Sequence, residues 1–125
     1  ISGQTILTDP FLSKHASPFS WVEPKRFVPP GISLKNLPQI DIILVSHNHY
    51  DHLDDETIRS LKNKDAINVV VPLGLKQFFT QRGYTNVIEL EWNEIAEVAD
   101  IEFTALPAVH NSSRSTKDLN KTLWA

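Results

Sequence analysis

Residues 42–52 read Ile42-Ile43-Leu44-Val45-Ser46-His47-Asn48-His49-Tyr50-Asp51-His52. The first four residues form a continuous apolar run, which predicts a strand buried on both faces because its hydrophobic residues do not alternate. Three imidazoles and one carboxylate then follow within six positions at the carboxyl end of that strand. His47 and His49 are two residues apart, so in an extended segment their side chains leave on the same side and can converge on one ion.

This cluster predicts a metal site. Asp51 and His52 come after the chain has turned, so they can address a second position beside the first. Imidazole and carboxylate ligands together suit zinc, with iron or manganese as alternatives. The competing interpretation is a polar loop that is rich in histidine by chance. That interpretation would place three of the five histidines of the chain within six residues by accident.

The segment from His47 to His52 resembles the His-x-His-x-Asp-His signature of the metallo-β-lactamase superfamily. Extended to Asp54, it is similar to the branch that contains N-acyl-phosphatidylethanolamine-hydrolysing phospholipase D and its bacterial relatives. Other segments agree with that branch: Leu7-Thr8-Asp9-Pro10, Ala16-Ser17-Pro18, Pro24-Lys25-Arg26-Phe27, Leu37-Pro38-Gln39-Ile40-Asp41, Val71-Pro72-Leu73-Gly74-Leu75 and Asn86-Val87-Ile88-Glu89-Leu90. The resemblance implies an α/β fold, the metallo-β-lactamase-like αββα sandwich.

The resemblance also implies roles for individual residues. The first metal would be held by His47, His49 and His110, and the second by Asp51 and His52. Asp51 would in addition orient or deprotonate the attacking water. His110 follows a predicted strand, where a lone histidine is otherwise more often a surface residue than a ligand. Two zinc ions are expected in the complete protein, acting in metal-assisted hydrolysis of a phosphodiester as in phospholipase D.

Two other functions stay open. One is a lactonase related to the sugar-phosphate lactonases of the superfamily, and the other is a metal-binding module without turnover. The second stays open because no counterpart of the superfamily's bridging carboxylate and last histidine follows His110. Asp118 lies too close to His110 to be assigned as that bridge. Asp9 is either a turn residue or an outer acceptor that orients a metal-ligating imidazole.

Length limits the architecture. A chain of 125 residues can form one modest domain, whereas the αββα sandwich usually needs substantially more. We therefore expect residues 1–125 to be a single metallo-hydrolase domain, truncated at both ends, that represents the N-terminal half or an incomplete copy of the sandwich. The start at Ile1 and a strand that begins near Lys121 fit this expectation.

Composition disfavours several functions. A formal net charge of −3 offers no basic field for nucleic acid. No stretch approaches the roughly 20 apolar residues of a membrane-spanning helix. The absence of cysteine excludes disulfides and thiolate ligands. We expect a small-molecule or lipid-like substrate, no nucleic-acid partner and, by default, a cytoplasmic location. Peripheral membrane association and the oligomeric state stay open.

Hydrophobic patterns and turn residues predict the remaining elements. Strands are expected at residues 4–8, 40–46, 67–71, 86–90, 94–98 and 101–106, and helices from Asp54 or Asp55 to Lys64 and from Leu73 to Arg82. The last two strands are expected to be joined by a turn at Ala99 and Asp100. Alternating strands and helices followed by antiparallel strands are typical of an α/β layered sandwich.

A long connection over residues 11–38 contains four aromatic residues, Phe11, Phe19, Trp21 and Phe27. We expect aromatic side chains to anchor it, either over the mouth of a site or through local packing. Solvated positions are expected for His15, Lys25 and Arg26.

Overall fold

The computed structural model describes residues 1–17 and 24–125. The described residues form β1 (Ile6–Thr8), the 3-10 helix η1 (Leu34–Asn36), β2 (Ile42–Leu44), α1 (Asp55–Ser60), β3 (Asn68–Pro72), α2 (Lys76–Thr80), β4 (Asn86–Leu90), β5 (Ile95–Val98) and β6 (Ile101–Thr104). None of their helices is long and apolar enough to cross a membrane.

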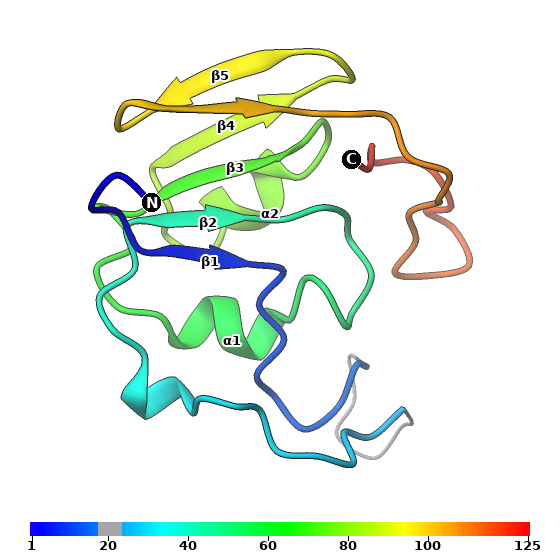
Figure 1. Cartoon of the computed structure of the whole chain (residues 1–125). Helices are drawn as coiled ribbons and strands as arrows, with labels where there is room; N and C mark the ends of the chain where they lie inside the picture. The colour runs from blue at the N-terminus through cyan, green and yellow to red at the C-terminus, as the bar shows by residue number, and fades with distance from the viewer. Residues whose placement is uncertain (18–23) are drawn as a thin grey trace.

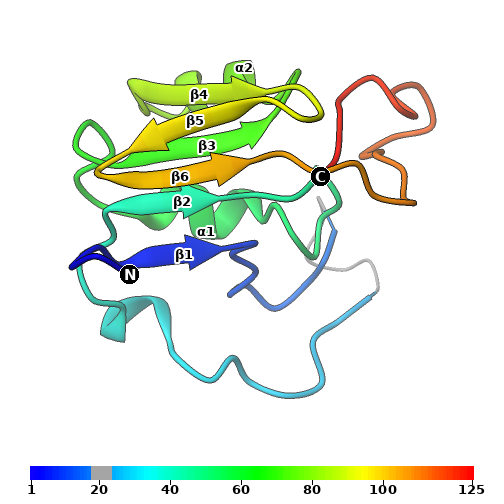
Figure 2. The same ribbon diagram turned by 45° about the horizontal axis from the view of Figure 1, so that its top comes forward.

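The strands form one parallel sheet and one hairpin (Figure 1). The sheet has the order β1-β2-β3-β4, so strands that follow one another in the chain are also neighbours in the sheet. Helices α1 and α2 connect its strands and pack on one face, whereas the antiparallel β5–β6 hairpin lies over the other face (Figure 2). This arrangement of helices, sheet and second sheet confirms the predicted α/β class.

Alternate residues of the central strands enter two separate cores. Ile43 of β2 packs toward the helices, together with Ile58 of α1 and Phe79 of α2. Its neighbour Ile42 packs on the opposite face, together with Val98 at the end of β5. The non-alternating apolar run of β2 is therefore buried on both faces, as predicted, and the predicted turn between β5 and β6 is also confirmed. Both turn residues have a left-handed backbone, with φ of 51° at Ala99 and 60° at Asp100.

All six predicted strands are present, but both helices are shorter than predicted. Helix α1 ends at Ser60 and not at Lys64, because Leu61 already has an extended backbone. Asn63 then turns the chain with a φ of 53°. Helix α2 spans Lys76–Thr80 and not 73–82. Leu73 continues the sheet instead, since its N–H donates to the carbonyl of Leu90 in β4.

The segment after Lys121 does not form the predicted strand. Its backbone makes single hydrogen bonds to two neighbours, from the N–H of Leu123 to the carbonyl of Leu73 and from the N–H of Ala125 to the carbonyl of Ser46. The chain therefore crosses the carboxyl ends of the parallel strands. Its close approach depends on Gly74, where a Cβ atom would lie 3.2 Å from the Cα atom of Thr122.

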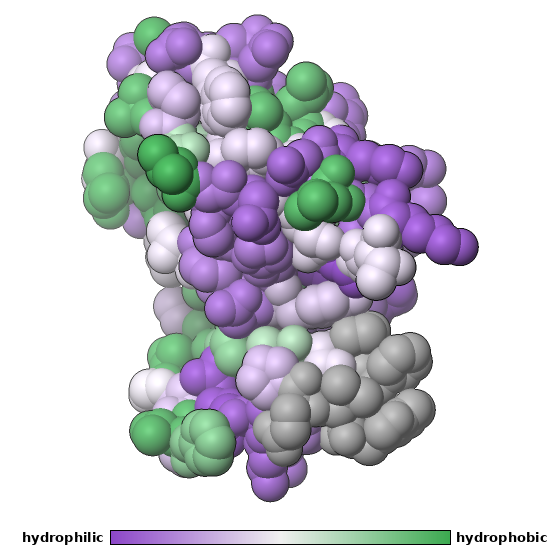
Figure 3. Space-filling view, turned by 90° about the vertical axis from the view of Figure 1, so that its right-hand side faces the viewer, coloured by the Kyte–Doolittle hydropathy of each residue, from purple (hydrophilic) through white to green (hydrophobic). Residues whose placement is uncertain are grey.

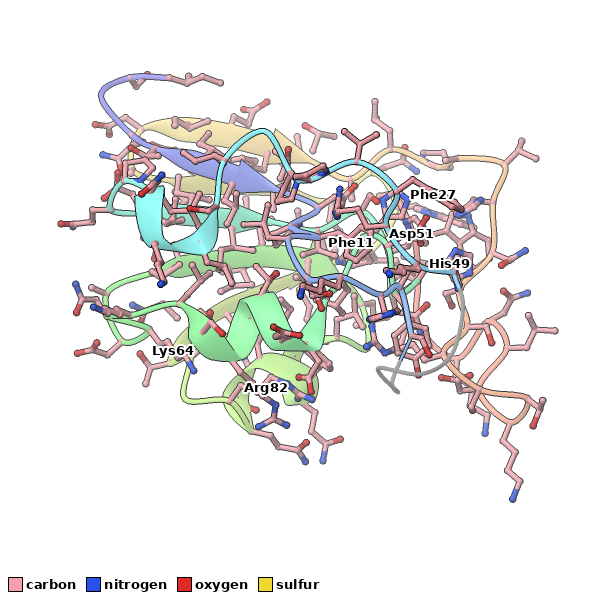
Figure 4. All side chains as sticks on the ribbon, turned by 90° about the horizontal axis from the view of Figure 1, so that it is seen from below. Phe11, Phe27, His49, Asp51, Lys64 and Arg82 are labelled. Atoms are coloured by element: carbon pink, nitrogen blue, oxygen red, sulfur yellow. The ribbon has the colours of Figure 1, made fainter. Side chains whose placement is uncertain are left out.

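The long connection is anchored at Phe11, so the prediction of an aromatic anchor is confirmed for this residue. The guanidinium of Arg26 donates hydrogen bonds to the carbonyls of Ser13 and Phe11 and stacks on the Phe11 ring. The expectation of a solvated Arg26 is therefore wrong. Phe27 is 95% exposed and anchors nothing (Figure 4). The predictions for Phe19 and Trp21 lie outside the described residues.

The other two polar residues of the connection lie opposite each other. His15 and Lys25 form an isolated antiparallel bridge. His15 is half-buried and therefore less exposed than predicted, whereas Lys25 is exposed, as predicted.

Candidate metal centre

Three histidines converge beyond the carboxyl end of β2. The Nε2 atom of His47 lies 2.9 Å from Nδ1 of His49 and 2.9 Å from Nε2 of His110. One nitrogen from each ring lies within 4.8 Å of the other two. His110 reaches the group from the loop that follows β6, although it is 63 residues away from His47 in the chain. The fold thus brings together the three imidazoles that the resemblance assigns to a first metal.

The donor set fits one small cation. Nitrogen ligands of a tetrahedral zinc ion, each about 2.0–2.1 Å from the metal, lie about 3.3 Å from one another. A neutral imidazole has one N–H and one lone pair, so Nε2 of His47 cannot form good hydrogen bonds to both neighbouring nitrogens. A cation between the rings would accept a lone pair from each. The three ring nitrogens thus lie close together without enough protons to hydrogen-bond one another. This is the observation that favours a metal ion between them.

The protonation state of His47 also suits a metal ligand. Burial, and then repulsion from the rings of His52, His110 and His49, lowers the pKa of His47 to about 4. The side chain is therefore neutral at neutral pH, which is the state in which imidazole binds metals. His47 is only 4% exposed, whereas His110 is exposed, so the group opens to solvent on one side.

Asp51 and His52 lie beside this group and not within it. Oδ2 of Asp51 is 3.8 Å from Nε2 of His52, and the centroid of the His52 ring is 4.1 Å from that of His47. Their side chains are 58% and 37% exposed. The two residues thus form a pair of donors next to the three imidazoles, and Figure 4 shows Asp51 and His49 at the same end of the molecule.

Asp9 holds the start of the histidine-rich turn from the neighbouring strand. Its Oδ1 accepts the N–H of Ser46 at 2.7 Å, and its Oδ2 lies 3.0 Å from Nδ1 of His52. The adjacency follows from the parallel register, in which Thr8 of β1 pairs with Leu44 of β2. These contacts agree with the outer-acceptor alternative for Asp9.

Arg114 also holds the histidine-rich turn in place, and nothing in the sequence marks it. Its Nη1 donates to the carbonyls of Asn48 and Leu53, at 2.9 and 2.6 Å, and its guanidinium stacks 4.0 Å from the centroid of the Tyr50 ring. The Tyr50 hydroxyl in turn donates to the carbonyl of Arg114. The loop that carries His110 is thereby tied to the turn that carries the other imidazoles.

Asp118 is engaged within its own loop. Its carboxylate accepts hydrogen bonds from the backbone N–H groups of Arg114 and Ser115, which lower its pKa although burial opposes them. This local role agrees with leaving Asp118 out of the metal ligands.

Figure 3 shows the face of the molecule at which the parallel strands end. Hydrophilic side chains cover the middle of this face. An apolar pocket of about 320 Å³, which is open to solvent, lies between the carboxyl ends of the parallel strands and the hairpin. Asp9 and Ser46 line this pocket, so the hydrogen bonds between these two residues lie next to apolar side chains.

A family model described as "Beta-lactamase superfamily domain" matches residues 4–125. The chain belongs to this superfamily. It is 41% identical over 127 residues to the mitochondrial N-acyl-phosphatidylethanolamine-hydrolyzing phospholipase D of Saccharomyces cerevisiae. It is 37% identical over 135 residues to N-acyl-phosphatidylethanolamine-hydrolyzing phospholipase D 1 of Caenorhabditis elegans. The alignments cover 98% and 100% of this chain but only 27% and 38% of those relatives.

Two solved structures share the fold of this chain. CmlA, a diiron beta-hydroxylase from Streptomyces venezuelae, matches with a TM-score of 0.62 and 29% identity over 84% of this chain and 20% of its own. A possible metal-dependent hydrolase from Veillonella parvula matches with a TM-score of 0.58 and 29% identity over 76% of this chain and 40% of its own. The predicted superfamily and fold are confirmed. Because CmlA is named as a diiron protein, the shared fold does not determine which metal is bound.

Proposed function

We propose that this chain carries the first metal site of a metal-dependent hydrolase, with His47, His49 and His110 as its ligands. The convergence of one nitrogen from each ring within 4.8 Å supports the proposal. Zinc is the favoured ion, because three imidazoles leave the fourth tetrahedral position for water, as in catalytic zinc sites. Iron is the alternative, since CmlA is named as a diiron protein.

A second ion is proposed beside the first, at the pair formed by Asp51 and His52. Their donor atoms face each other at 3.8 Å, and the His52 ring adjoins that of His47. Metal ions in such a site lower the pKa of a coordinated water to about 7 and polarise the electrophile. Within this chain, Asp51 is the group placed to hold that water or accept its proton. The half-exposed Asp51 carboxylate can be reached by a substrate.

The substrate proposed is a phosphodiester of the phospholipid type. Two relatives named as N-acyl-phosphatidylethanolamine-hydrolyzing phospholipases D support this class. The polar middle of the surface in Figure 3 suits a charged head group. Exposed apolar side chains on the connection before β2, Phe27 and Val28, suit the apolar part of a lipid.

Metal content tests the proposal most directly. The purified protein, a His49→Ala variant and a His15→Ala control are dialysed against trace zinc and analysed by plasma mass spectrometry. His15 is the matched control, because it lies on the connection outside the three-imidazole group. We expect at least one zinc ion per chain in the parent and the control, and a loss of at least tenfold in zinc affinity in His49→Ala. Equal zinc content in all three proteins, or none in the parent, would refute the metal site.

Substrate class needs a separate measurement. The zinc-loaded protein is assayed with bis(p-nitrophenyl) phosphate and with a simple lactone, and the His49→Ala variant is assayed beside it. Phosphodiester cleavage that depends on His49 supports the proposal. Cleavage of the lactone alone would refute the phosphodiester substrate and indicate a lactonase. Metal binding without either reaction would indicate a metal-binding module.

A further inference from the structure

One carboxylate contacts both halves of the candidate site. Asp9 follows β1 directly and has a left-handed backbone with a φ of 40°. Its Oδ2 accepts the hydroxyl of Ser46 at 2.8 Å and lies 3.0 Å from Nδ1 of His52. The same Ser46 Oγ is 2.8 Å from Nδ1 of His47. Asp9 thus reaches His52 directly and His47 through a hydroxyl group.

The number of available protons fixes the direction of these hydrogen bonds. An ionised carboxylate only accepts, and a serine hydroxyl has a single proton to donate. Ser46 therefore donates to Asp9, and its oxygen can only accept from His47. The Nδ1 atom of His47 then carries the ring proton, and the lone pair is left on Nε2. That nitrogen is the one that faces His49 and His110.

The same reasoning applies to His52. Its Nδ1 must donate to Asp9, which leaves the lone pair of the neutral ring on Nε2. This nitrogen lies 3.8 Å from the carboxylate of Asp51, at the second proposed position. Both rings are therefore held in the tautomer whose free lone pair points toward a metal position.

We propose that Asp9 and Ser46 are positioning residues that set the tautomers of His47 and His52 together, so that one carboxylate prepares both metal positions. The proposal rests on the metal site proposed above and adds the residues that orient its ligands. Outer partners of metal-bound histidines typically change metal affinity by about 10–100-fold when they are removed.

Nitrogen-15 NMR of the zinc-free protein at neutral pH tests the tautomers directly, since protonated and unprotonated ring nitrogens differ widely in chemical shift. We expect Nδ1 of His47 and of His52 to be protonated in the parent. In Ser46→Ala, His47 alone should lose this preference. In Asp9→Asn, both rings should lose it. A parent in which Nδ1 of His47 is unprotonated, or in which His52 is doubly protonated, would overturn the proposal.

Zinc affinity gives the second readout. We expect Ser46→Ala to bind zinc about 10–100-fold more weakly than the parent, whereas Ser46→Thr keeps the hydroxyl and should stay within about threefold. Ser60→Ala is the matched control, because the Ser60 hydroxyl donates only to the carbonyl of Glu56 on the exposed side of α1. Thermal unfolding of each variant verifies that it is folded. A folded Ser46→Ala protein with parental zinc affinity would overturn the proposal.

These measurements separate the two proposals. Correct tautomers in a protein that binds no zinc would refute the metal site and leave the positioning by Asp9 intact. Zinc binding that depends on His49, combined with the wrong tautomer of His47, would refute the positioning and leave the metal site intact.

Discussion

Replacing Arg114 with methionine should loosen the connection between the His110 loop and the histidine-rich turn. The variant loses two hydrogen bonds from a charged donor, to the carbonyls of Asn48 and Leu53, each worth about 1.5–3 kcal/mol. It also loses the stacking on Tyr50, worth about 0.5–2 kcal/mol. Part of this loss is recovered, because burial of the guanidinium, which lowers the pKa of Arg114, costs solvation free energy.

The net destabilisation is therefore about 3 kcal/mol. For a domain of this size, about 4 °C of melting temperature corresponds to 1 kcal/mol, so a decrease of about 12 °C is expected. Differential scanning calorimetry of the zinc-free protein measures it. Arg114→Lys should recover less than half of the decrease, since lysine keeps the charge but not the planar fork that reaches two carbonyls.

Arg59→Met is the matched control. Arg59 makes an exposed ion pair with Asp55 within α1, worth about 0.3–0.5 kcal/mol, so its melting temperature should change by no more than about 2 °C. Zinc titrations should show weaker binding in Arg114→Met than in Arg59→Met, because only the first change releases the His110 loop. Equal melting temperatures for the two variants would refute the role assigned to Arg114.

Three further predictions concern stability. Because burial lowers the pKa of His47 to about 4, the folded metal-free protein binds fewer protons than the unfolded chain between about pH 6.5 and pH 4, and its stability should fall by up to about 3 kcal/mol as the pH is lowered through that window. Urea unfolding in a chelating buffer should show this slope, and His47→Asn should flatten it. Gly74→Ala should cost about 1–3 kcal/mol by thermal unfolding, because φ is 95° and the new Cβ would meet the backbone of Thr122, whereas Gly31→Ala, which points into open space, should be nearly neutral. Ala99→Gly should raise the melting temperature by a few degrees, because alanine has a φ of 51° in the β5–β6 turn.

Local patterns predicted the fold well. The apolar run of β2 indicated burial on both faces, and Ile42 and Ile43 do enter different cores. The strands could be predicted because the pattern of apolar residues in a strand depends on which faces of the sheet are buried. The helix ends could not, since Leu61 and Leu73 leave the helical conformation for contacts that helical periodicity does not encode.

The site was predictable only in part, and for a physical reason. The donors of the histidine-rich turn are adjacent in sequence, so their spacing indicates a metal centre without any knowledge of the fold. Arg114 acts on the same turn across 61 and 66 residues of chain, through carbonyl groups that every residue possesses. No side-chain pattern at Asn48 or Leu53 distinguishes them as its acceptors, so this contact could be found only in the folded chain.

Asp9 lies between these two cases. It directly follows one predicted strand, and Ser46 ends the next, so the parallel register of β1 on β2 in the structure is enough to bring the two residues together. Groups at the carboxyl ends of neighbouring parallel strands meet at the same edge of the sheet, where ligand sites of α/β proteins form. In the sequence, Asp9 is an isolated aspartate before a proline. Only the strand order shows that it lies beside Ser46 and His52. Its contribution to the site thus depends on pairing between strands that are separated by the whole of the long connection.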